Sequence, residues 1–104
     1  MSTTVLSIPY YKLIDSIDRF IRKNSYTYFD WFIGLTDNAE KTLFEEHKLN
    51  REKDSWIYEE VLNDSDAKRI QKYFLNMGCV GGVFNHHTTS KFIYVYRRSL
   101  NSNP

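Results

Sequence analysis

The residues best suited to hold a ligand follow a pair of glycines near the carboxyl end of the 104-residue chain. Gly81 and Gly82 allow a backbone turn that other residues avoid. A run of polar residues with donors suited to a phosphate or a base edge comes soon after: Asn85, His86, His87, Thr88, Thr89, Ser90 and Lys91. Their order does not match the Gly-x-x-x-x-Gly-Lys-Ser/Thr pattern of phosphate-binding loops. The run is therefore either a ligand-binding loop on a rigid scaffold or an ordinary exposed loop.

The turn after the first predicted strand is a second candidate for binding an anion. Gly34 ends an apolar run, and Asp37 with Glu40 forms a capping box that begins a helix. Backbone N–H groups at the start of a helix attract anions, and Thr36 and Asn38 add side-chain hydrogen bonds. A tight strand-to-helix turn that binds nothing explains the same residues.

The positions of the histidines and of the cysteine give little support for metal binding or for nucleophilic catalysis. Neighbouring residues on a strand point to opposite faces, so His86 and His87 cannot easily share one ion. Structural zinc takes four Cys or His ligands, and the chain has one cysteine and three histidines. Cys79 follows a predicted helix end, where the negative end of the helix dipole raises a thiol pKa. We therefore expect no metal site and an inert cysteine.

Hydrophobic periodicity predicts the elements that position these residues. Apolar residues at helical spacing and strand-like aromatic runs alternate along the chain, which predicts the order α-β-α-β-α-β. The expected fold is α+β, a small three-stranded sheet covered by three helices, in one domain spanning 1–104. Its parts are an N-terminal helix at 7–24, an α+β core at 26–98 and a tail at 99–104. The first strand is expected at 26–33, and Asp64 or Ser65 caps the last helix, which Gly78 ends.

The composition of the chain limits the functions and locations that we expect for the protein. The net charge of +1 lacks the basic excess that is typical of strong nucleic-acid binders. A single cysteine excludes an intrachain disulfide and favours a reducing, cytoplasmic location. The chain has no apolar run long enough for a membrane span, and its start is unlike a signal peptide. A three-stranded sheet leaves two edges to protect, which favours a homo-oligomer or a protein partner.

One stretch resembles part of a known enzyme family. Phe32-Ile33-Gly34, followed by Thr36 and by His47 at the end of the next helix, resembles the second half of the GIY-YIG nuclease core. In that family a strand ends in Tyr-Ile-Gly, a small hydroxyl residue follows, and a histidine commonly closes the helix. The resemblance extends weakly from this stretch to Tyr96 and implies a nuclease-like core.

The chain departs from that family at the positions that carry its chemistry. The first motif, Gly-Ile-Tyr, is absent upstream, Thr42 stands at the position of the helical arginine, and Gln71 stands at that of the metal-binding glutamate. Phosphodiester hydrolysis needs a carboxylate to hold a divalent cation such as Mg²⁺. The resemblance therefore implies a degenerate core without this catalysis.

The sequence predicts a non-catalytic intracellular module that captures an anionic ligand, either a nucleotide or a short nucleic acid, without a cofactor. Phosphate is held by the 34–38 turn and by the glycine-polar loop, which is Gly81, Gly82 and the polar run 85–91. Arg97 and Arg98 add positive charge, and a tyrosine or tryptophan stacks on the base. Such a compact module also suits a virus or a mobile element.

Two alternatives stay open. A divergent Mg²⁺-dependent nuclease would use His47, Tyr58 and Glu59 or Glu60 in place of the usual glutamate. A protein–protein adaptor or inhibitor would use an open sheet edge and bind no nucleotide.

Overall fold

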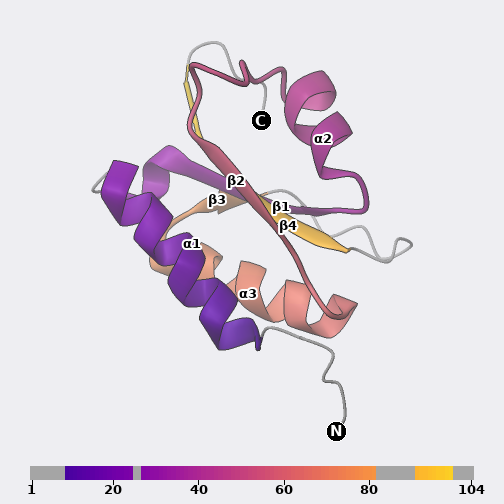
Figure 1. Cartoon of the computed structure of the whole chain (residues 1–104). Helices are drawn as coiled ribbons and strands as arrows, with labels where there is room; N and C mark the ends of the chain where they lie inside the picture. Colours follow the sequence, from indigo (N-terminus) through magenta and orange to yellow (C-terminus); the bar gives the residue numbers. More distant parts are fainter. Residues whose placement is uncertain (1–8, 25–26, 82–90, 100–104) are drawn as a thin grey trace, which may run out of the picture.

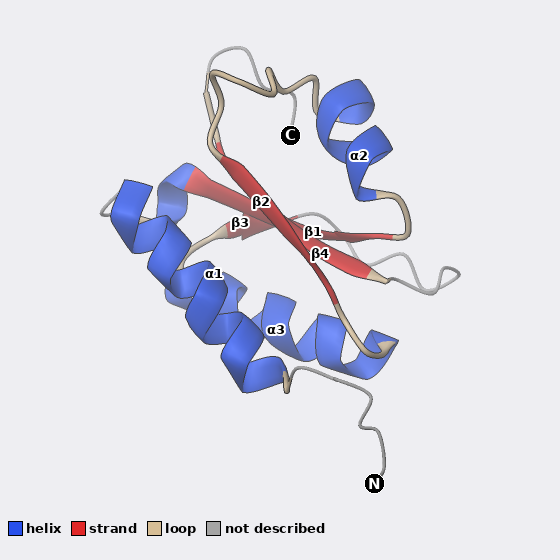
Figure 2. Ribbon diagram, viewed as in Figure 1, coloured by secondary structure: helices blue, strands red, loops and turns tan. Residues whose placement is uncertain are grey.

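A computed structural model describes residues 9–24, 27–81 and 91–99. The elements in these ranges are α1 (Tyr10–Asn24), the 3₁₀ turn η1 (Tyr28–Asp30), β1 (Trp31–Thr36), α2 (Ala39–Lys41), the π-helix η2 (Thr42–Glu46), β2 (Trp56–Glu60), α3 (Asp64–Met77), β3 (Val80–Gly81) and β4 (Phe92–Arg97). Figures 1 and 2 show a central sheet with α1 and α3 on one face and α2 on the other. Within the described ranges, no helix has the length and apolar character that a bilayer crossing requires.

The sheet is mixed and has the strand order β2-β4-β1-β3 within the described residues. β4 runs antiparallel to both β1 and β2, and β3 lies parallel to β1. The α+β class is therefore confirmed, but the prediction of three strands is wrong because β3 adds a fourth. β3 contains only Val80 and Gly81, and two residues carry no hydrophobic alternation that a sequence pattern could reveal.

The face under α1 and α3 holds the larger apolar core. Residues one helical turn apart on α1 (Leu13, Ile17 and Ile21) are buried against the sheet. They meet Ile93 and Val95, which alternate along β4 and are fully buried. Sequence periodicity identified this core because both elements follow a regular pattern.

The opposite face carries a smaller, aromatic core beneath α2 and η2. Tyr94 and Tyr96 alternate with the residues of the first core along β4, and they pack with Phe32, Leu43 and Leu49. One strand therefore supplies side chains to both cores, because successive residues of a strand point to opposite faces.

The positions at which elements were predicted to start were less accurate than the predicted types of these elements. The first strand covers Trp31–Thr36, not 26–33; η1 takes the place of its first half, and residue 26 lies outside the described part. Asn38, not Asp37, caps α2, and its Oδ1 accepts a backbone N–H three residues on at 3.1 Å. Asn63 caps α3 in the same way at 2.8 Å. Asn and Asp cap helices about equally well, so composition could not choose between neighbouring candidates.

Candidate functional site

The predicted anion-binding residues lie at two separate ends of the sheet. Lys91 donates its backbone N–H to the Thr36 carbonyl at 3.2 Å, so the start of β4 adjoins the 34–38 turn. Arg97 is the last residue of β4 and Arg98 follows it. Arg97 is six residues from Lys91, which is about 20 Å along a strand. Gly81 lies on β3 beside Ile33. The remaining members of the glycine-polar loop lie outside the described residues: Gly82, Asn85, His86, His87, Thr88, Thr89 and Ser90.

The polar atoms of the 34–38 turn bind one another. Thr36 Oγ1 lies 2.7 Å from Thr42 Oγ1 and also accepts the Asn38 backbone N–H at 3.0 Å. The Asn38 side chain caps α2. The strand-to-helix turn itself therefore explains these contacts without a ligand.

Gly34 leaves space for a tyrosine ring. A Cβ added at Gly34 would lie 2.3 Å from Tyr94 Oη and 2.4 Å from Tyr94 Cζ, which is too close for any side chain. The contact arises because Gly34 pairs directly with Tyr94 across β1 and β4. A larger residue at Gly34 would displace Tyr94 from the aromatic core.

His47 lies at the centre of that core. Its Nε2 is 2.9 Å from Tyr94 Oη, its Nδ1 is 2.9 Å from Tyr96 Oη, and its ring packs on Phe32 at 5.0 Å. The exposed fractions of His47, Tyr94 and Tyr96 are 8%, 5% and 0%. Burial raises the pKa of both tyrosine hydroxyls well above the ordinary value. The cluster joins η2 to β4 and is closed to a dissolved substrate.

In the version of the nuclease alternative that uses Glu59, the residues do not converge. Tyr58 lies on the same face as His47, but its hydroxyl donates to Glu40 at 3.1 Å. Glu59 lies on the opposite face, where it accepts a hydrogen bond from Ser16 of α1 at 3.0 Å. In residues 9–24, 27–81 and 91–99, no group of three His, Cys, Asp or Glu side chains is placed to hold a metal ion.

Two other residues singled out from the sequence are buried. Gln71 donates from Nε2 to the Ile33 carbonyl at 3.4 Å, while its Oε1 has no partner among the described residues. Burial, with a smaller contribution from the Asp18 carboxylate, raises the pKa of the Cys79 thiol to about 12. A thiol in that state is a poor nucleophile at neutral pH.

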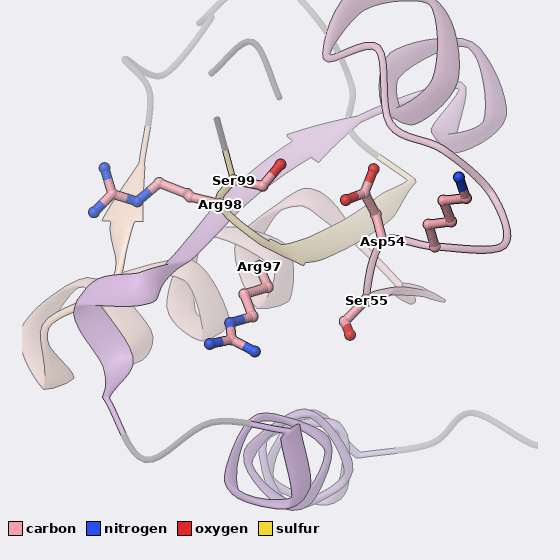
Figure 3. Close-up of a pocket in the computed structure, with 6 residues that line it drawn as sticks. Asp54, Ser55, Arg97, Arg98 and Ser99 are labelled. Carbon is pink, nitrogen blue, oxygen red and sulfur yellow. The ribbon is translucent and has the colours of Figure 1, made fainter. Parts of the chain in front are cut away.

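A surface pocket of about 310 Å³ opens where the chain enters β2 and leaves β4. Three cations and one carboxylate are among its lining residues, which are Lys53, Asp54, Ser55, Arg97, Arg98 and Ser99 (Figure 3). The segment before β2 meets the end of β4 because Arg97 donates its backbone N–H to the Ser55 carbonyl at 2.9 Å. The sequence prediction included both arginines but missed the other four residues, since only the β2–β4 register brings them together.

A compact turn fixes the Lys53 side of the pocket. The Asn50 side chain accepts the backbone N–H groups of Glu52 and Lys53 at 2.9 and 2.8 Å. Asp54 accepts the Asn50 N–H at 2.6 Å, so the one carboxylate of the pocket already has a partner. Its charge therefore opposes an incoming anion less than a carboxylate without a hydrogen-bond donor would.

The same loop is tied to α2 through Arg51. The Arg51 guanidinium forms an ion pair with Glu40 and lies 4.0 Å from the centre of the Phe44 ring. This hydrogen-bonded pair lowers the pKa of Glu40 and raises that of Arg51. Trp56 donates from Nε1 to the Arg51 carbonyl at 2.9 Å. These contacts anchor the loop next to Lys53.

The two arginines of the pocket point in different directions, as Figure 3 shows. Neighbouring residues at a strand end alternate between faces. Arg97 donates from Nη1 to the Asn24 carbonyl at the end of α1, at 3.4 Å. Arg98 donates from Nη2 to the Phe29 carbonyl at 2.6 Å, and its Nε is buried without a partner in the described part of the chain. The guanidinium groups of both arginines thus bind backbone carbonyls, at the end of α1 and in η1.

Comparisons of this chain with protein-family models, with curated proteins and with solved structures found no match. The GIY-YIG resemblance therefore stays a prediction.

Proposed function

We propose that the protein is a non-catalytic module that binds a phosphate-bearing anion in the pocket lined by Lys53, Arg97 and Arg98. The observation that supports this most directly is the composition of the pocket: three cations, two hydroxyl side chains and one carboxylate that is already hydrogen-bonded. Lysine and arginine are the usual phosphate-binding side chains. The pocket is open at the surface, which suits stoichiometric capture better than a reaction that needs water excluded.

Isothermal titration calorimetry with inorganic phosphate and pyrophosphate tests the proposal. Lys53 is the best residue to change, because its backbone N–H, and not its ammonium group, donates the hydrogen bond to Asn50 that holds the turn. Lys53→Gln should weaken binding about tenfold or more, since a charge-assisted hydrogen bond contributes about 1.5–3 kcal/mol. A second readout is thermal unfolding, because ligand at 100 times Kd adds about 2.7 kcal/mol of stability.

Arg19→Gln is the matched control. Arg19 is an exposed cation on α1 that forms an ion pair with Asp15 and does not line the pocket. Its removal changes the net charge by the same amount and should leave the affinity unchanged. Equal effects of Lys53→Gln and Arg19→Gln, or no phosphate binding by the unaltered protein, would refute the proposal.

A second function, self-association, is favoured by the outer edge of β2. Hydrogen bonds at both ends of the β2–β4 pair, Arg97 to Ser55 and Val61 to Lys91, direct the backbone groups of alternate residues toward β4. The backbone N–H and C=O groups of Trp56, Tyr58 and Glu60 consequently point away from the sheet. β2 crosses in front of the other strands in Figure 1, at an edge of the sheet. Such an edge can pair with a strand from a second copy.

Light scattering after size-exclusion chromatography tests this second function. Glu60→Pro deletes an outward N–H but no β2–β4 hydrogen bond, because Glu60 faces away from β4. If β2 edges pair, the unaltered protein and Glu60→Ala should be dimers and Glu60→Pro a monomer. A monomeric unaltered protein at high concentration would rule the pairing out.

A further inference from the structure

The outward backbone groups of β2 belong to Trp56, Tyr58 and Glu60, which are spaced evenly about Tyr58. Each residue of β2 pairs one-to-one with a residue of β4, so the strand keeps a regular pleat up to both of its ends. Its sequence, Trp-Ile-Tyr-Glu-Glu, contains neither proline nor lysine, which commonly block pairing at a sheet edge. A second β2 strand can therefore bond this edge, and the spacing limits the registers that it can take.

One register bonds every outward residue of the strand. Antiparallel hydrogen bonds join residues that both face the partner strand, so an outward residue must lie opposite another outward residue. In a two-fold dimer centred on Tyr58, this tyrosine lies opposite its own copy and Trp56 lies opposite Glu60 of the second copy. All outward N–H and C=O groups of both strands are then paired.

The neighbouring registers are less favourable. A dimer centred on Ile57 would place Glu60 opposite Asp54, whose backbone N–H is already donated to the Asn50 carbonyl at 3.0 Å. That register also sets two carboxylates against each other. A dimer centred on Glu59 would place this residue directly opposite its own copy, in the closer type of antiparallel pair, where like charges repel. Each of these registers also leaves an outward residue of both strands without a partner inside β2.

Charge on the α2 face favours the same register. Side chains of residues that lie directly opposite each other share one face of the sheet. The Arg51 guanidinium lies 5.8 Å from the centre of the Trp56 ring, and its side chain is 54% exposed. Centring the dimer on Tyr58 therefore brings the exposed Glu60 of the second copy next to Arg51, and symmetry repeats this contact.

We propose that two copies pair through β2 as an antiparallel dimer centred on Tyr58, which joins their four-stranded sheets into one continuous sheet. This inference rests on the self-association proposed above and names the register and the contacts of that interface. A two-fold interface uses the same patch on both copies and is closed. At the opposite edge of the described sheet, β3 spans two residues, which is too short to extend the assembly readily.

Disulfide cross-linking in a Cys79→Ala background tests the register, because Cys79 is the only cysteine of the chain. In the proposed dimer, position 57 of one copy lies directly opposite position 59 of the other. An oxidised equimolar mixture of Ile57→Cys and Glu59→Cys should therefore form a mixed disulfide dimer. Each variant alone should stay uncross-linked, because identical positions are then two residues out of register, about 7–8 Å apart, and beyond the usual reach of a disulfide.

Mass spectrometry identifies which chains are joined, and far-UV circular dichroism checks that each variant is folded. Ser65→Cys, at an exposed position of α3, measures cross-linking by random collision and should give none at the same concentration.

The outcomes distinguish the inference from the self-association on which it rests. A monomeric unaltered protein overturns both and leaves the β2 edge to another protein. Cross-linking of Ile57→Cys with itself, or of Glu59→Cys with itself, places the two-fold axis at that residue and overturns the inference alone. A dimer that cross-links in none of these samples also overturns the inference, and Glu60→Pro then shows whether β2 holds that dimer.

Discussion

Among single residues, Gly34 makes a contact that no other residue type could make. Gly34→Ala would place a methyl group 2.3 Å from Tyr94 Oη and force the ring away from His47. Overpacking in a core typically costs about 1–3 kcal/mol, and the broken hydrogen bond adds about 1 kcal/mol. We expect Gly34→Ala to lower the free energy of unfolding by about 2 kcal/mol or more, measured by urea denaturation.

A double-mutant cycle identifies the cause of that loss. In a Tyr94→Leu background the phenol ring is gone, so adding Gly34→Ala should cost far less than it does in the unaltered protein. If the two costs are equal, backbone freedom and not the tyrosine ring explains the glycine. The φ angle of Gly34 lies outside the left-handed region, which already favours the steric explanation.

The buried thiol of Cys79 makes stability depend on alkaline pH. Its pKa rises from 9.0 to about 12 on folding, so the unfolded chain releases this proton first. The stabilisation is complete below pH 9 and is lost as the pH rises from 9 to 12, by about 1.4 kcal/mol per pH unit.

The comparison that isolates this effect uses Cys79→Ala. Tyrosine and lysine ionisation acts on both proteins and cancels in their difference. Urea titrations under reducing conditions should show the stability advantage of the unaltered protein over Cys79→Ala shrinking by about 1 kcal/mol between pH 9 and pH 10, because the unfolded thiol is already half ionised at pH 9. A difference that stays constant across this range would mean that the thiol is accessible in the folded state.

The sequence indicated which residues are important more readily than it indicated what those residues contact. Gly34 and His47 were singled out from their types and spacing, but their common partner Tyr94 lies 47 residues from His47 along the chain. That contact depends on the pairing of β1 with β4, which local patterns do not encode. Lys53 was missed because a surface lysine becomes informative only when the β2–β4 register brings its loop to the end of β4.

At the level of elements, the end of η2 carries a local strain that can be relieved. Lys48 has a φ of 59°, the left-handed conformation that costs residues other than glycine about 1 kcal/mol. This conformation lets Leu49 donate its backbone N–H to the Leu43 carbonyl at 3.1 Å and turn inward. Lys48→Gly should raise the melting temperature by about 4–8 °C, because 1 kcal/mol has that effect in a domain of this size.

Lys48→Ala serves as the control for that prediction. Alanine removes the charge and the long side chain but keeps a Cβ, so it should not reproduce the stabilisation. A gain with alanine similar to that with glycine would point to the lysine charge, and no gain with glycine would show that its greater freedom in the unfolded chain offsets the relief.

The elements themselves were predicted where their patterns are long. α1 and α3 span 15 and 14 residues and bury regular apolar stripes, so periodicity identified both. The second helix was predicted as one continuous element to His47, whereas it is a three-residue α-helix continued by a five-residue π-helix. Thr42, the first residue of the π-helix, contacts Thr36 of β1, and no helical repeat in the sequence reveals such a tertiary contact.

For the whole molecule, the sheet is the feature that joins both cores and the candidate site. β4 supplies alternate side chains to the two faces, and its final residues line the pocket with the segment before β2. The predicted anion site combined the two ends of this strand, because the sequence shows both groups of polar residues without their separation. The strand order decides which of them can meet.

This shared sheet predicts that the two cores unfold together, and the two tryptophans can report on it. Trp31 is buried beneath α1, 5.5 Å from Phe20, whereas Trp56 lies on the α2 face against Phe44. In Trp31→Phe the fluorescence follows the α2 face, and in Trp56→Phe it follows the α1 face. Within each variant, the urea midpoints from fluorescence and from far-UV circular dichroism should coincide, as cooperative unfolding requires. A fluorescence transition in Trp31→Phe at clearly lower urea than the loss of helix signal would show that α2 and η2 detach first from a sheet still held by α1 and α3.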